Sequence, residues 1–269
     1  MPANALTRLG GGLAQALAAL RQAHSWRWLA YGIAVGGAAG LAACGYFAAI
    51  EWLQGFFLTR LAGLSLPAPA GEHLFHMEPG AYRPWLVPVF TSLAGLVTGF
   101  FIQRYVPETV TSGTDGTDAT TRAFHRQGGL VPPRVPLIRG LASILTIATG
   151  GSAGREGPIA QIGGGIGSWL AQRLQLSARE RRLLLLAGAA GGMGAIFRAP
   201  LGGALTAVEV IYREDFEAEA ILPAVMSSVT AYSVFTFFFG TQSILAAPAF
   251  QFTDPRELVF YAVLALVCS

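Results

Sequence analysis

The chain has 269 residues, of which 53% are apolar and only 12% are charged, and its formal net charge at pH 7 is +3. Soluble domains carry about 25% charged residues, so this composition excludes an ordinary soluble protein and indicates an integral membrane protein. The basic balance does not indicate nucleic acid binding, because the arginines flank apolar segments, as the positive-inside rule predicts, and no basic run is long.

The first part of the chain predicts a leader followed by a membrane span. Residues 1–28 are predicted to form an amphipathic leader at the cytoplasmic surface, because they lack the pattern of a cleavable signal. Residues 29–53 are an apolar run long enough to cross a bilayer, which takes about 20 residues. Arg21 and Arg27 precede this span and predict a cytoplasmic N-terminus.

A second span is predicted at residues 85–102, and it returns the chain inward. Residues 103–139 contain five arginines, so this segment is predicted to be cytoplasmic. Within it, residues 119–125 predict a short helix capped by Thr117 or Asp118.

From residue 136 onward the pattern changes to four short apolar runs, at residues 137–149, 159–170, 183–196 and 201–212. Each run is about a dozen residues long and is bounded by glycine or proline, whereas a full span takes about 17–25 residues. Short, interrupted segments of this kind are typical of transport sites built from broken helices.

The C-terminal part predicts a third long span and the start of another helix. Residues 217–239 are long and apolar enough to cross the bilayer, and residues 258–269 begin a further apolar helix. Because the chain stops within that apolar run, we interpret it as a fragment. Neither Cys44 nor Cys268 belongs to a metal or disulfide pattern, so that no metal and no cofactor is implied.

A motif at residues 150–158, Gly-Gly-Ser-Ala-Gly-Arg-Glu-Gly-Pro, separates two of the short runs. Its Arg155 and Glu156 carry charge within apolar sequence, and charge inside a membrane segment indicates a functional site. Proline is favoured in the first turn of a helix, so Pro158 places Glu156 at a helix N-terminus, where free N–H groups and the helix dipole attract anions. The alternative is that Glu156 merely occupies a first helical turn, where acidic residues are common.

Two blocks of the sequence resemble the CLC family of chloride channels and chloride/proton antiporters. One is Gly-Arg-Glu-Gly-Pro at residues 154–158, and the other lies within residues 189–212, above all Phe-Arg-Ala-Pro-Leu-Gly-Gly-Ala-Leu at 197–205 and Val-Glu-Val at 208–210. Their order and spacing match the first of the family's two inverted structural repeats. The resemblance implies an all-α integral membrane fold of broken and tilted transmembrane helices, with residues 29–257 as the first repeat and residues 258–269 as the truncated start of a further helix.

The resemblance also implies roles for the residues of the first block. The backbone amides around Gly154, Arg155 and Gly157 would bind a dehydrated anion. Glu156 matches the gating glutamate of the family, whose carboxylate occupies an anion site and leaves when it is protonated or displaced.

An earlier motif of the family, Gly-Ser-Gly-Ile-Pro, matches residues 114–118 at the family's spacing. Gly116 is retained there, but Asp115 replaces the serine that would face the anion, and an ionised Asp115 would repel chloride. A register three residues earlier offers Ser112 instead. The alternative is that Asp115 and Asp118 are helix caps.

The resemblance favours a channel-like member, because family antiporters usually carry a proton-transfer glutamate where this chain has Val210. Coupled exchange would need another acid, such as Glu214 or Asp215. The implied protein transports chloride or a similar anion across the inner cell membrane as a homodimer, with interface segments at 201–212 and 217–239. It is not expected to be an enzyme, because a membrane-embedded enzyme requires convergent titratable groups. An inactive structural membrane subunit is the other alternative.

Overall fold

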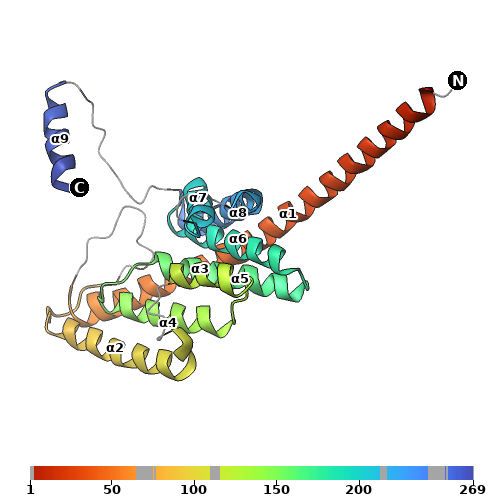
Figure 1. Ribbon diagram of the computed structural model, residues 1–269. Coiled ribbons are helices and arrows are strands. Elements are labelled where there is room, and N and C mark those ends of the chain that lie inside the picture. The colour runs from red at the N-terminus through yellow and green to blue at the C-terminus, as the bar shows by residue number, and fades with distance from the viewer. Residues whose placement is uncertain are drawn as a thin grey trace.

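The computed structural model describes residues 3–64, 75, 77–109, 116–212, 217–241, 252 and 254–268, with side chains of the first helix described from Trp26 onward. Over these residues the regular structure is helical throughout (Figure 1), which confirms the all-α expectation. The α-helices are α1 (Ala3–Gln54), α2 (Leu86–Tyr105), α3 (Gly116–Arg126), α4 (Arg134–Ala148), α5 (Glu156–Arg173), α6 (Ala178–Ile196), α7 (Pro200–Glu209), α8 (Ile221–Phe239) and α9 (Glu257–Cys268). A π-helical segment (Gly55–Leu61) continues α1, and short 3₁₀ turns lie at Pro107–Thr109 and Ala218–Ala220.

Three of the described helical segments are long and apolar enough to cross a membrane: Trp26–Leu61, Leu86–Tyr105 and Ala218–Phe239. They correspond to the three long spans predicted from the sequence. Helix α1 is continuous through residue 28, so that the predicted leader and the first span share one helix of 52 residues. Its N-terminal end projects from the bundle in Figure 1, and α9 lies apart from the other helices.

The helices between residues 134 and 209 are shorter, as expected for broken membrane helices. Helix α4 has 15 residues and α7 has 10, which correspond to about 22 Å and 15 Å of helix, less than the roughly 30 Å of a hydrocarbon core. Helices α5 and α6, with 18 and 19 residues, extend beyond the predicted apolar runs. The extra residues are polar ends, such as the Ser177 and Glu180 capping box that starts α6.

Helix α6 forms the centre of the bundle. Every residue from Leu183 to Ile196 is buried, because α5, α7, α8 and α1 all pack around it. The crossing with α5 brings two backbones into contact: a Cβ at Gly188 would lie 2.0 Å from the Gly163 carbonyl oxygen. Small residues at helix crossings are the usual means of close packing in membranes.

Helix α3 starts earlier than predicted, at Gly116. Thr117 and Asp118 therefore lie in the first helical turn, and the prediction that one of them caps the helix is wrong. The Thr120 hydroxyl donates to the Gly116 carbonyl at 2.9 Å, which shows that the helical turn already includes Gly116. Asp115, the other predicted cap, lies outside the described residues.

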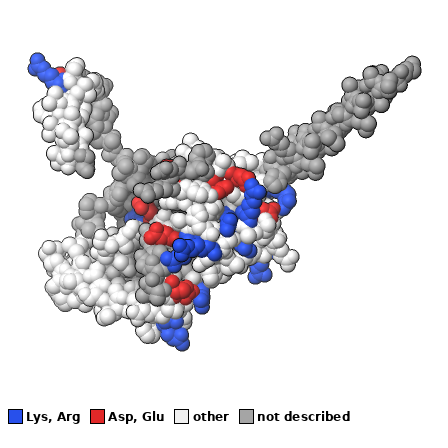
Figure 2. Space-filling model, viewed as in Figure 1, with Lys and Arg blue, Asp and Glu red and all other residues white. Residues whose placement is uncertain are grey.

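Charged side chains gather at one end of the bundle, where α3 and α5 end and α4 and α6 begin. We call this the charged end; it includes ion pairs between Arg27 and Glu180 (3.7 Å), between Arg134 and Glu108 (2.8 Å) and between Arg179 and Glu219. Figure 2 shows these charges concentrated on part of the surface, whereas the surface over most of α2 carries none. The first membrane span therefore has the Arg27 end of α1 at the same side as the basic ends of α3 and α6.

Candidate functional site

Glu156 is the first residue of α5, as the motif predicted. Arg155 precedes it in a helical conformation (φ −82°, ψ −16°), and its side chain makes no capping hydrogen bond. The first intrahelical bond runs from the Ile159 N–H to the Arg155 carbonyl, at 3.2 Å. The N–H groups of the first turn have no helical carbonyl to bond, so the dipole of α5 presents its positive end at Glu156.

The N-terminus of α3 meets the N-terminus of α5 at two glycines. A Cβ at Gly116 would lie 1.9 Å from the Gly157 carbonyl oxygen, and a Cβ at Gly157 would lie 3.0 Å from the Gly116 nitrogen. No side chain fits between these backbones. The contact therefore brings together residues from the two motifs that the sequence separates by about 40 positions, and it places two positive helix ends side by side.

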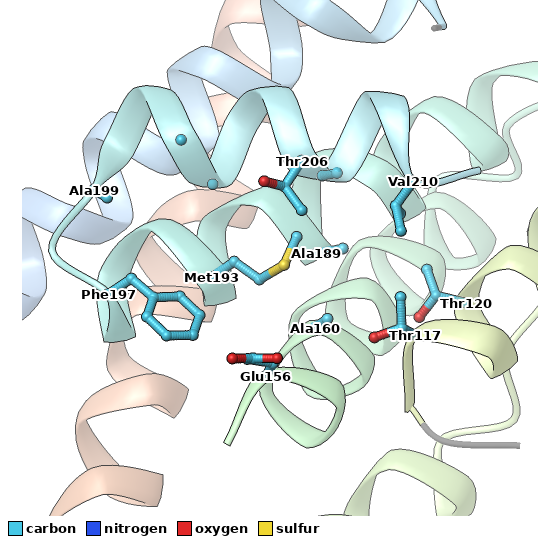
Figure 3. A pocket seen from close by; sticks show the side chains of 13 residues that line it. Thr117, Thr120, Glu156, Ala160, Ala189, Met193, Phe197, Ala199, Thr206 and Val210 are labelled. Carbon is cyan, nitrogen blue, oxygen red and sulfur yellow. The ribbon is translucent and has the colours of Figure 1, made fainter. Parts of the chain in front are cut away.

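A pocket of about 460 Å³ opens beside this contact, and Glu156 lies on its wall (Figure 3). Helix α5 forms one side, α3 contributes Thr117 and Thr120, and α7 lies across the opposite side with Thr206 and Val210. Helix α6 contributes Ala189 and Met193, and Phe197, Ala199 and Ala207 complete the apolar part with the glycines at 202 and 203. The pocket thus joins one carboxylate to a wall of hydroxyl and apolar groups.

The pocket extends from Glu156 toward the charged end. Val210 lies at the C-terminal end of α7, and the next residue, Ile211, bonds through its carbonyl to His125 Nε2 at 2.7 Å. Helix α3 therefore has Gly116 at the Glu156 site and His125 near the charged end. These nine residue steps correspond to about 14 Å of helix, which is close to half of a hydrocarbon core of about 30 Å.

The other predicted site residues lie around Glu156 in different ways. The Arg155 guanidinium lies over the Phe47 ring of α1, with 5.7 Å between Cζ and the ring centroid. Gly154 is exposed, and a Cβ there would meet nothing within 4 Å. Ser112 and Asp115 lie outside the described residues, as do the acids at 214 and 215.

The sequence does not predict that α6 and α7 contribute to the pocket wall, although residues 197–205 belong to a recognisable motif. The turn between the two helices depends on Arg198, which has a left-handed backbone (φ 52°). Its Nη2 lies 3.5 Å from the Phe239 carbonyl, and its Cζ lies 5.9 Å from the Phe235 ring centroid. Strained non-glycine residues cluster at functional sites, but the backbone angle of Arg198 is visible only in the structure, so the sequence contains no signal of this wall beyond the motif itself.

The chemistry of this arrangement is that of anion binding. The positive ends of two converging helices attract a carboxylate and would favour a small anion for the same reason. Among the described residues, no group of three or more His, Cys, Asp or Glu side chains is arranged to hold a metal ion.

Both the sequence and the fold are similar to those of known proteins. Residues 94–269 match a family described as voltage gated chloride channel. The H⁺/Cl⁻ exchange transporter ClcA of Klebsiella pneumoniae is 29% identical over 236 residues, which are 87% of this chain and 47% of that protein.

Two solved structures have similar folds. A CLC-type fluoride/proton antiporter has a TM-score of 0.69 and 20% identity, over 90% of this chain and 54% of its own. A slow cyanobacterial Cl⁻/H⁺ antiporter has a TM-score of 0.66 and 25% identity, over 90% of this chain and 53% of its own. The chain spans about half the length of the curated relatives it matches.

Proposed function

The chain belongs to the voltage gated chloride channel family, and we propose that it contributes to transport of chloride or a similar small anion across a membrane, with Glu156 as the gate. The observation that carries this proposal is the position of Glu156. Glu156 lies where two helix N-termini meet, on the wall of a pocket.

Gating follows from competition between like charges. When the Glu156 carboxylate is ionised and remains at the helix ends, it occupies the positive potential that an anion needs. When the carboxyl group is protonated or turns away, that potential is free for an anion. Backbone groups at Gly154, Arg155 and Gly157, and at Gly116 on α3, are proposed to bind the anion. Ser112 and Asp115 remain candidates for the same site.

The proposed orientation places the charged end in the cytoplasm, because basic residues are enriched on that side. The N-terminal end of the first span lies at the same side, since Arg27 contacts Glu180, so the N-terminus is proposed to be cytoplasmic. A homodimer is proposed through α7 and α8, whose outer faces expose Leu201, Leu205 and Phe237. In a bacterial cell the membrane would be the inner one.

Proton-coupled anion exchange is the second candidate, because similar proteins include an H⁺/Cl⁻ exchange transporter and a Cl⁻/H⁺ antiporter. Val210 favours the uncoupled mode, because valine cannot carry a proton and it lines the inner part of the pocket. The two modes differ in one measurement: only exchange moves protons when chloride moves.

The test is flux from the purified chain in lipid vesicles, measured for chloride, fluoride and nitrate, with and without a pH gradient. Wild-type protein is expected to carry chloride with a dependence on pH, and Glu156→Gln is expected to carry it at a rate that no longer changes with pH. Glu209→Gln is the matched control, because Glu209 is an exposed acid at the end of α7 that does not line the pocket.

Three outcomes decide between the possibilities. Unchanged pH dependence in Glu156→Gln contradicts the gate. If chloride movement drives proton movement in the wild type, the channel mode is contradicted and proton-coupled exchange is supported. If the folded wild-type chain carries no anion, independent transport is rejected, and the alternative of a structural membrane subunit remains.

A further inference from the structure

A second hollow lies on the membrane-facing side of the bundle, between α2 and α4. It has a volume of about 200 Å³ and is lined by Val97, Thr98 and Phe101 of α2 and by Ile138, Leu141, Ala142 and Leu145 of α4. The Thr98 hydroxyl donates to the Gly95 carbonyl at 3.2 Å, so that the polar group of this groove already has a partner. The groove is suited to a hydrocarbon chain.

The two helices that form the groove run antiparallel. The ion pair between Arg134 and Glu108 (2.8 Å) joins the start of α4 to the turn that follows α2. At the opposite end, a Cβ at Gly150 would lie 3.3 Å from Val87 Cγ1, so the end of α4 meets the start of α2. The C-terminal end of α2 and the N-terminal end of α4 therefore both lie at the charged end.

Two arginines continue the groove at that end. Thr98, Phe101 and Arg104 follow one another at intervals of three residues, and Arg134, Ile138, Leu141 and Leu145 follow at intervals of three and four. Residues three or four apart are neighbours on a helix surface, so Arg134 continues the α4 side of the groove and Arg104 lies next to Phe101 on α2. The Arg104 guanidinium lies over the Tyr105 ring at 5.7 Å, and both side chains are exposed. Glu108 holds Arg134 in position, so the pair of arginines with this one acid leaves a net positive charge.

Arg134 and the lining residues of α4 together span a length that corresponds to one leaflet of a bilayer. From Arg134 to Leu145 is eleven steps along α4, or about 16 Å, and half of a hydrocarbon core is about 15 Å. Positive charge at one end of an apolar groove, over a combined length of about one leaflet, matches the shape of a phospholipid. Tyrosine is also enriched at this level of the membrane.

We propose that the groove between α2 and α4 is a binding site for one anionic phospholipid of the cytoplasmic leaflet, with its phosphate at Arg104 and Arg134 and one acyl chain against Phe101, Leu141 and Ala142. This site is separate from the Glu156 pocket, since the two have no lining residue in common. The proposal therefore holds or fails independently of anion transport.

The test is thermal unfolding of the purified full chain in detergent, titrated with phosphatidylglycerol and with phosphatidylcholine of the same acyl chains. Phosphatidylglycerol is expected to raise the unfolding temperature with a half-saturating concentration about tenfold below that of phosphatidylcholine, the ratio that one charge-assisted contact supplies. Arg104→Gln is expected to remove this difference and Arg104→Lys to retain part of it. Ala142→Trp, which fills the groove, is expected to weaken both lipids.

Matched controls test the location. Arg173→Gln removes an exposed arginine that lies over the Trp169 ring at 5.6 Å, in the same way as Arg104 over Tyr105, but outside the groove. Leu96→Trp enlarges an exposed residue of α2 that does not line the groove. Both are expected to respond like the wild type.

The proposal is overturned if Arg104→Gln keeps the preference for phosphatidylglycerol, or if inorganic phosphate alone produces the same shift. A folded Ala142→Trp protein that binds lipid like the wild type also overturns it. Because Arg104 is exposed, its variants decide the question even where Ala142→Trp does not fold.

Discussion

At the scale of single residues, the contact between Gly116 and Gly157 determines where the two helix N-termini lie. A methyl group at Gly116 would overlap the Gly157 carbonyl oxygen, because the Cβ would lie 1.9 Å from it. A real Cβ cannot occupy that space, so the ends of α3 and α5 would have to separate. The positive ends would then no longer converge beside Glu156.

Gly116→Ala is therefore expected to reduce stability by about 1–3 kcal/mol, the usual cost of an overpacked contact, and to reduce chloride flux of the folded protein. Thermal unfolding and vesicle flux measure the two effects. Gly99→Ala in α2 is the matched control, because it adds the same methyl group where nothing lies within 4 Å and outside the Glu156 pocket, and is expected to leave the packing and the flux unchanged. Equal behaviour of the two variants would contradict this account of the contact.

Val210 provides a second test at the residue scale, because it lines the pocket on the side of the charged end. Val210→Glu adds a carboxylate that is neutral at low pH and negative at high pH. The negative form repels an anion by about 1 kcal/mol at 4 Å even in water, so flux should fall about fivefold as the pH rises through the pKa of the new side chain.

Val210→Gln, with a similar shape and no charge, should not add this pH dependence. Flux is measured from pH 4.5 to 8 in vesicles with the same chloride gradient. If both variants follow the pH dependence of the wild type, then Val210 does not lie along the anion pathway.

The local part of the site was predictable from the sequence, and its long-range part was not. Glu156 was placed at a helix N-terminus because Pro158 and the neighbouring glycines act within one turn. Thr206 and Met193 were not recognised as pocket residues, because their approach to Glu156 depends on how α6 and α7 pack. No periodicity in the sequence reports such a contact between helices.

At the scale of helices, the crossing of α5 and α6 depends on a glycine in each helix, because no side chain fits between the two backbones. A Cβ at Gly188 would lie 2.0 Å from the Gly163 carbonyl oxygen, and a Cβ at Gly163 would lie 2.1 Å from the Gly188 carbonyl oxygen. The crossing fixes the position of α5 relative to α6, and both helices contribute to the same pocket: α5 starts with Glu156, and α6 contributes Met193.

Gly188→Ala is expected to destabilise the protein by about 1–3 kcal/mol, since neither backbone can yield without moving a helix. Gly37→Ala, in α1, adds a methyl group where nothing lies within 4 Å and should be neutral or stabilising by up to about 1 kcal/mol, the difference in helix propensity. Thermal unfolding of both variants in one detergent measures the contrast. A Gly188→Ala protein as stable as Gly37→Ala would show that the crossing has room for a side chain.

Helix lengths were only partly predictable, and the reason is again physical. The apolar runs at 159–170 and 183–196 are shorter than α5 and α6, because hydropathy detects only the residues inside the hydrocarbon. Helix α6 begins instead at the Ser177 capping box, a polar signal of helix start. Helix α3 already includes Gly116, three residues before the predicted start, and its first turn packs against α5 at this glycine.

At the scale of the whole molecule, the distribution of charge predicts how the chain lies in the membrane. The ends of α3 and α5 and the starts of α4 and α6 share the charged end, and the connection before α2 lies at the opposite end, where Gly150 approaches Val87. The positive-inside rule then places Arg126 in the cytoplasm and Tyr82 on the other side. Tyr82 is 72% exposed, and Arg126 is exposed as well.

Single cysteines at these two positions test that orientation in a chain whose Cys44 and Cys268 are replaced by alanine. A membrane-impermeant maleimide should label Arg126→Cys in inside-out vesicles and Tyr82→Cys in right-side-out vesicles, and each variant should remain unlabelled in the opposite preparation. Detergent-permeabilised vesicles are the control for a reactive thiol in both. Labelling with the sides exchanged would invert the proposed orientation, so that the charged end would lie outside and the lipid groove would lie in the outer leaflet. Labelling of both variants from one side would contradict the separation of the two ends by the membrane.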